Sequence, residues 1–253
     1  MNNQVIFLLW ISVGINILCF FIGGFIFLKK ARYYYLFLKT LKFLNLQKSL
    51  HLDYPPYYWH KKSQYELLPQ TESEIIMLGD SITDEGEWIE LLGNIKVKNR
   101  GISGDTTERI LYRLSTIIAS QPKQIFLMIG INDLINSKKS VIEILESYQE
   151  ILQEFQEKTP HTEIFIQSVL PVHNKIYIYW HDNKNIINLN LGLQKLAQKF
   201  NYKYIDLFSK LIDSENQLDV KYTVDGLHLN GHAYLVWKSV IEKYLATSEI
   251  QKS

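Results

Sequence analysis

The chain has 253 residues, with 27 Lys and Arg against 26 Asp and Glu, a net charge of +1, 47% hydrophobic residues and a single cysteine. This apolar content supports a folded core and excludes a disordered chain, while one cysteine excludes a disulfide scaffold. A nearly neutral chain without an Arg-rich tract has no field that would attract a polyanion, so we expect no nucleic-acid partner.

The first predicted element is an apolar run at residues 5–28 that contains no charged side chain. As a helix it would extend about 35 Å, which is enough to cross the hydrocarbon core of a bilayer. A cleaved signal peptide fits less well, because no basic stretch precedes the run and no A-x-A-like site follows it. We therefore expect residues 1–30 to form a single-pass membrane anchor.

Residues 31–71 form a basic and aromatic segment after this run. Three basic residues follow the run directly, namely Lys29, Lys30 and Arg32. The positive-inside rule then predicts that the C-terminal domain is cytoplasmic. Tyrosines and phenylalanines between the lysines favour a helix at the membrane surface, and the alternative is a helix that packs on the domain. Pro55 and Pro56 indicate a break, so we expect a linker or strap up to residue 71.

Residues 72–253 show strands alternating with helices. Short apolar runs predict five buried strands, at 75–78, 95–97, 125–129, 164–169 and 204–207. Apolar spacing of three and four residues predicts helices at 106–118, 141–155, 186–200 and 233–244. The predicted fold class is α/β, a three-layer α/β/α sandwich with a five-stranded, mostly parallel sheet. In such a fold the ligand site lies at the carboxyl ends of the strands.

Polar clusters follow three of these strands and precede the last helix. They are GDS at 79–81, NRGISGD at 99–105, GIND at 130–133 and DGLH at 225–228. The ordered set resembles the SGNH family of GDSL-type serine hydrolases, whose four blocks carry Ser, Gly, Asn and His. The resemblance covers about residues 74–244. It implies a flavodoxin-like SGNH fold and hydrolysis of an ester or thioester.

Three of these residues predict nucleophilic catalysis. A serine hydroxyl is a weak nucleophile near neutral pH and needs a base that takes its proton, with a third group that orients the base. We expect Ser81 to be the nucleophile and His228 to be the base. Asp225, three residues before His228, is expected to orient the imidazole and to stabilise its charged form.

The family resemblance also implies an oxyanion hole. Its donors would be the backbone N–H groups of Ser81 and Gly104 and the side-chain amide of Asn132. Gly104 suits this role, because the absence of Cβ lets backbone approach a ligand closely. Each of these residues has a simpler interpretation as a helix cap or a turn residue, but four independent caps would not be expected to form this ordered set.

A metal site is the less favoured alternative. His228 and His232 lie four residues apart and, with Asp225, could ligate a metal, but no HExxH-like sequence or Cys/His cluster supports this. There is no P-loop, no G-x-G-x-x-G and no G-x-S-x-G around Ser81. We therefore predict a serine esterase without metal or cofactor.

The resemblance is strongest to small-acyl esterases, including carbohydrate acetylesterases and the platelet-activating-factor acetylhydrolase-like branch. We expect hydrolysis of short, acetyl-like acyl esters of a carbohydrate or lipid through an acyl-enzyme on Ser81. Trp88 and residues 170–172 and 177–180 are candidates for the pocket wall. The alternatives are a lysophospholipase or thioesterase, an O-acyltransferase at the membrane, and a non-catalytic membrane-tethered binding domain.

Overall fold

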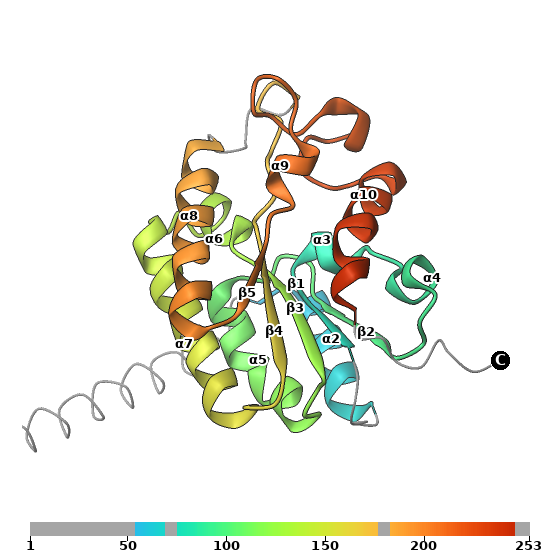
Figure 1. The fold of residues 1–253 in the computed structure, drawn as a ribbon, viewed down its shortest axis with the longest axis vertical. Coiled ribbons are helices and arrows are strands. Elements are labelled where there is room, and N and C mark those ends of the chain that lie inside the picture. The colour runs from blue at the N-terminus through green and yellow to red at the C-terminus, as the bar shows by residue number, and fades with distance from the viewer. Residues whose placement is uncertain (1–53, 69–74, 177–182, 246–253) are drawn as a thin grey trace, which may run out of the picture. The chain divides into compact units, whose positions relative to one another are not determined.

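The computed structural model describes residues 54–68, 75–176 and 183–245 (Figure 1). The described residues from Pro56 onward belong to one compact unit. The predicted anchor and the basic segment up to residue 53 lie outside the described residues, so the anchor stays a prediction. Within the described ranges, no helix is long and apolar enough to cross a membrane.

A five-stranded parallel sheet forms the middle layer, with the strand order β2-β1-β3-β4-β5. The strands are β1 (Ile75–Gly79), β2 (Val97–Gly101), β3 (Gln124–Met128), β4 (Glu163–Gln167) and β5 (Lys203–Ile205). The central strands β1 and β3 are buried along their whole length. This explains why they read as continuous apolar runs, since helices cover both faces of the sheet. The predicted α/β class and parallel five-stranded sheet are confirmed.

Helices form the two outer layers (Figure 1). The neighbours α5 (Thr107–Ala119), α7 (Val141–Lys158) and α8 (Asn183–Phe200) pack side by side on one face. On the other side, α10 (Gly231–Ile241) contacts α4 (Trp88–Leu92). The shorter elements are α3 (Ser81–Asp84), α6 (Ile131–Ile135), α9 (Phe208–Leu211) and the 3₁₀ turns Val220–Tyr222 and Glu242–Tyr244. The predicted long helices are therefore present, with ends shifted by a few residues.

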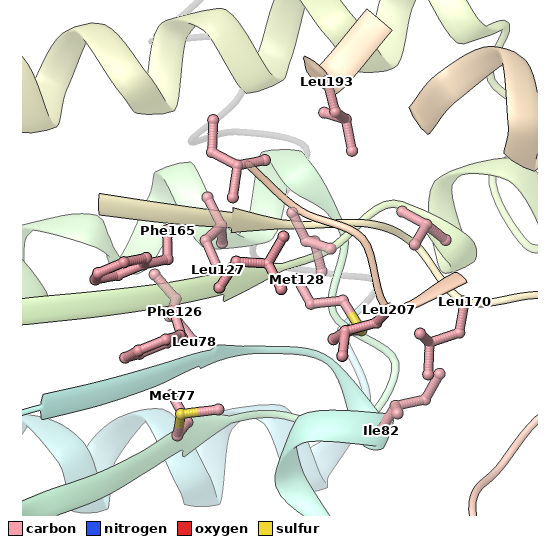
Figure 2. Close-up of a cluster of buried hydrophobic side chains, with 14 of the residues drawn as sticks. Met77, Leu78, Ile82, Phe126, Leu127, Met128, Phe165, Leu170, Leu193 and Leu207 are labelled. Carbon is pink, nitrogen blue, oxygen red and sulfur yellow. The ribbon is translucent and has the colours of Figure 1, made fainter. Parts of the chain in front are cut away.

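The core lies between the sheet and these helices (Figure 2). Phe126 of β3 and Phe165 of β4 are register partners, and their rings stack with centroids 4.5 Å apart. Trp88 of α4 and Trp237 of α10 meet edge to face at 4.8 Å. Both tryptophans are fully buried. Packing of this kind fixes the strand ends, and with them the loops that follow.

Strand β2 differs from its predicted position at 95–97. Ile95 is 79% exposed, and Val97 to Gly101 pair with β1 instead. The polar residues of this edge strand find partners at its end. The Asn99 side-chain amide donates to the backbone carbonyls of Thr83, Asp84 and Gly86. Residues 99–101, predicted to follow the strand as a loop, are therefore part of it.

Residues 56–67, expected in a linker, form helix α2 (Pro56–Leu67). Pro56 is its first residue, where a proline is tolerated because the missing N–H would have no helical partner. Tyr58 and Tyr65 are buried, and α2 contacts α5. Because lysines and other polar residues lie between these aromatic residues, the sequence shows no clear apolar face for this helix.

Candidate active site

The predicted nucleophile Ser81 lies where β1 passes into α3. The Asp80 side chain caps this helix by accepting from the Ile82 N–H at 3.1 Å, so Ser81 does not serve as the cap. Gly79 is required just before, since a Cβ there would lie 2.3 Å from Thr83 Oγ1 and 2.4 Å from the Met128 carbonyl oxygen. Ser81 is the first helical residue, so its N–H has no partner within the helix.

His228 and Asp225 face Ser81 from the loop before α10. His228 Nε2 lies 3.1 Å from Ser81 Oγ, and His228 Nδ1 lies 2.6 Å from Asp225 Oδ2. Asp225 Oδ1 accepts from the N–H groups of Leu227 and His228, at 2.9 and 2.8 Å. Burial raises the pKa of Asp225, but these hydrogen bonds outweigh it and hold the pKa below its ordinary value. The carboxylate is thus ionised and fixed toward the imidazole.

The loop that carries Asp225 and His228 is built around Gly226. Its φ of +85° lies in the left-handed region, and its N–H donates to Thr223 Oγ1 at 2.9 Å. The Gly226 carbonyl accepts from the His173 N–H at 2.8 Å. A Cβ on Gly226 would lie 2.9 Å from the His173 carbonyl oxygen. The turn interpretation of this motif is therefore correct as well, and the turn is what aims His228.

Gly104, a predicted oxyanion donor, occupies a tight turn after β2. The Asp105 N–H donates to the Ile102 carbonyl at 3.0 Å, and Gly104 has a φ of +79°. A turn of four residues with positive φ at its third residue only is type II. The Ile102 N–H donates to the Gly79 carbonyl at 3.1 Å, which joins this turn to the end of β1.

Asn132, the third predicted donor, is the second residue of α6. Its side-chain amide donates to the Asp105 carbonyl at 3.0 Å, and its Oδ1 accepts from Asn136 at 2.9 Å. The first bond uses one of the two amide hydrogens and leaves the second for another acceptor. Asn132 and the Gly104 turn are thus linked through Asp105.

A buried ion pair below this loop was missed by the sequence reasoning. Arg113 Nη2 lies 2.8 Å from Asp105 Oδ2 and also donates to the carbonyls of Arg100 and Gly79, at 2.7 and 3.3 Å. Both side chains are almost completely buried. Burial raises the pKa of Asp105 to about 6, although Arg113 opposes this. The available signal was a lone basic residue on the apolar face of the helix, beside Ile110 and Leu114.

A second carboxylate stands beside the imidazole. Glu85 Oε1 lies 3.9 Å from His228 Nε2, and about half of the Glu85 side chain is exposed. Nothing in its sequence position, next to a helix end, distinguishes it from an ordinary surface residue. The Glu85 carboxylate therefore lies beside the same imidazole nitrogen that faces Ser81 Oγ.

The residues considered for a metal site or for the pocket wall lie elsewhere or have other roles. His232 is exposed on α10, while His228 faces Ser81 and Asp225. In the part of the chain that the structure describes, no three His, Cys, Asp or Glu residues are grouped so as to hold a metal ion. Trp88 is buried and donates to the Thr83 carbonyl, so it is a core residue and not a pocket wall. Residues 177–180 lie outside the described residues.

Comparisons with known proteins give a family, related sequences and a similar solved structure. The sequence model of the GDSL-like Lipase/Acylhydrolase family matches residues 77–236. The rat platelet-activating factor acetylhydrolase IB subunit alpha2 is 27% identical over 170 residues, which is 64% of this chain and 72% of that protein. A solved structure from Streptococcus pneumonia, described as a platelet activating factor, is 30% identical, with a TM-score of 0.69, covering 81% of this chain and 98% of that one.

A further relative is the N-acylneuraminate cytidylyltransferase of Escherichia coli. It is 30% identical over 171 residues, which is 67% of this chain. The chain spans only 39% of the length of that protein. The similarity therefore concerns a part of the bacterial enzyme.

Proposed function

Since the chain belongs to the GDSL-like lipase/acylhydrolase family of serine ester hydrolases, we propose that it cleaves short acyl esters, acetate esters in particular, through an acyl-enzyme on Ser81. The observation that carries the proposal is the chain of hydrogen bonds from Ser81 Oγ through His228 to Asp225. The acetylhydrolase activity in the name of the rat relative supports a small acyl group.

The first half of the proposed reaction forms the acyl-enzyme. His228 Nε2 takes the proton of Ser81 Oγ while this oxygen attacks the ester carbonyl carbon. The N–H groups of Ser81 and Gly104 and the amide of Asn132 donate to the oxyanion of the tetrahedral intermediate. The intermediate collapses when His228 Nε2 gives its proton to the leaving alcohol oxygen.

The second half regenerates the enzyme. A water molecule gives a proton to His228 Nε2 and attacks the acyl carbonyl, and the same donors stabilise the second oxyanion. Collapse releases the carboxylic acid and returns the proton to Ser81 Oγ. Asp225 stays ionised throughout. Its carboxylate accepts a hydrogen bond from the Nδ1–H group of the neutral imidazole, which leaves Nε2 unprotonated and able to act as the base.

Hydrolysis of p-nitrophenyl esters from acetyl to octanoyl tests this proposal. The full-length protein in detergent is compared with Ser81→Ala and with Ser209→Ala, which changes an exposed serine on α9. We expect turnover that falls with acyl length and is abolished only in Ser81→Ala. Turnover that rises with length would favour a lysophospholipase or thioesterase. Product formed only with a sugar or lipid acceptor would favour a transferase, and no serine-dependent reaction would overturn the proposal.

We also propose that residues 1–30 anchor the enzyme in a membrane, with the catalytic domain on the cytoplasmic side. The uncharged run at 5–28 and the basic residues that follow it support this. Protease treatment of intact cells tests the proposal, with a lysed sample as the control. We expect protection of the catalytic domain in intact cells. Digestion by external protease would reverse the orientation, and recovery in the soluble fraction would remove the anchor.

A further inference from the structure

Helix α2 precedes the part of the chain that matches the family, yet its side chains reach the active-site loops. We propose that Tyr57 and Lys61 of α2 are positioning residues, which hold Asp84 and, through it, the turn that presents the Gly104 N–H to the oxyanion. This inference rests on the proposed function. We call Tyr57, Lys61, Asp84 and Ser103 the Asp84 clamp.

Asp84 is the centre of the clamp and lies three residues after Ser81. Its Oδ2 accepts from the Tyr57 hydroxyl at 2.5 Å and from the Ser103 N–H at 3.2 Å. Its Oδ1 lies 2.8 Å from Lys61 Nζ, and only 5% of the Asp84 side chain is exposed. One carboxylate thus connects α2, α3 and the residue before Gly104.

The charges in the clamp depend on each other. Burial lowers the pKa of Lys61, but the hydrogen bond to Asp84 and the nearby tyrosines outweigh it, and the pKa lies above its ordinary value. The ammonium group is therefore charged wherever the enzyme would work. Removing it would leave the nearly buried Asp84 carboxylate without its cation, and such a carboxylate would turn toward water.

The turn that Asp84 holds can convert to another turn type. Type I and type II turns differ by rotation of their central peptide, which here joins Ser103 and Gly104. The N–H of this peptide belongs to Gly104, so the rotation would point the expected oxyanion donor away from the substrate. A glycine makes the alternative backbone easily accessible.

Both neighbouring peptides of this turn are held from outside. The Ser103 N–H donates to Asp84, and the Gly104 carbonyl accepts from Arg109 Nη1 at 2.8 Å. Helix α2 contacts both of these partners. It holds Asp84 through Tyr57 and Lys61, and its Tyr58 hydroxyl donates to the Arg109 carbonyl at 3.4 Å. The Tyr65 hydroxyl also donates to the Gly101 carbonyl at 2.8 Å. Fixing the flanking peptides disfavours rotation of the central one.

The test compares Lys61→Met with Lys62→Met in the full-length protein. Lys62 is the next residue on α2 and pairs with Glu66, so its substitution removes the same charge without touching Asp84. We expect Lys61→Met to lower kcat for p-nitrophenyl acetate roughly tenfold with KM unchanged, because a displaced oxyanion donor acts in the transition state. Lys62→Met should behave as the wild type, and Lys61→Arg should restore most of kcat.

A substrate-free measurement separates this inference from the proposed function. Hydrogen exchange of peptides covering residues 101–105 should be faster in Lys61→Met than in Lys62→Met. Equal exchange and equal kcat in the two variants would overturn the clamp. Equal exchange with a lowered kcat would overturn it as well, because the loss would then arise elsewhere. Absence of Ser81-dependent turnover in the wild type would overturn the proposed function, while the exchange comparison would still decide about the clamp.

Discussion

Ionisation of Asp80, the residue before the predicted nucleophile, destabilises the folded state, and a single substitution can measure this effect. Its side chain is buried, and burial raises its pKa from 3.8 to about 7. Asp80→Asn removes the ionisation but keeps an oxygen that can accept from the Ile82 N–H. We expect the variant to be more stable than the wild type at alkaline pH.

The sign and size of the change in the free energy of unfolding with pH follow from proton linkage. The folded pKa is above the unfolded value, so the folded state holds the proton more tightly and the free energy of unfolding falls as pH rises from about 4 to 7. A rise from 3.8 to about 7 corresponds to about 4 kcal/mol in total. Roughly 2–3 kcal/mol of this is lost between pH 5 and 8.5.

Urea denaturation at pH 5 and pH 8.5 measures this effect. The stability of Asp80→Asn relative to the wild type should increase by about 2–3 kcal/mol between the two conditions. The control is Asp206→Asn, since the Asp206 side chain also accepts from a backbone N–H, that of Ser209, but is exposed. A difference that does not change with pH, or the same change in Asp206→Asn, would refute the reasoning.

The remaining predictions concern the loops around Ser81. Arg113→Met leaves Asp105 buried without its cation, so the free energy of unfolding should fall by about 3–5 kcal/mol. Urea denaturation measures this, and a fall below about 1 kcal/mol would contradict a structural role for the pair. Gly104→Ala has room for the methyl group, whose nearest atom is an Arg109 nitrogen at 3.7 Å, but it forces a side chain into left-handed backbone. We expect a stability loss of about 1–2 kcal/mol and a fall in kcat of at least about tenfold. An unchanged kcat with p-nitrophenyl acetate would contradict the need for glycine at this position, because the N–H of residue 104 would then keep its place despite the added methyl group. Glu85→Gln should raise kcat/KM for an anionic ester about two- to fivefold relative to a neutral ester of the same acyl group, because the carboxylate lies beside His228. If the ratio of the two kcat/KM values did not change, Glu85 would have no effect on the preference between anionic and neutral esters.

The order of strands and helices could be read from the sequence because it depends on local pattern. The run 75–78 in β1 and the run 125–128 in β3 are apolar throughout, and the spacing in α5 and α7 is helical. The position of β2 was predicted wrongly because this strand depends on contacts that are distant in the sequence. This edge strand is held by pairing with β1 and by Asn99 on carbonyls thirteen to sixteen residues away, neither of which is visible in a short apolar run.

The candidate site was predictable to the extent that chemistry demands particular residue types. Ser81, Asp225 and His228 were identified from their motifs, and the structure brings their side chains into hydrogen-bond contact. Their catalytic roles, and those of Gly104 and Asn132, remain predictions until the variants are measured.

The sequence by itself determined the α/β class and the parallel sheet and predicted the residues of the candidate site, because periodicity and side-chain chemistry are properties of short segments. Only the tertiary structure decided that α2 packs on the domain, that Arg113 pairs with Asp105 and that Asp84 connects α2 to the Gly104 turn. These contacts join segments that are distant in the chain. Their energies depend on burial and on distances between partners, which exist only once the chain has folded.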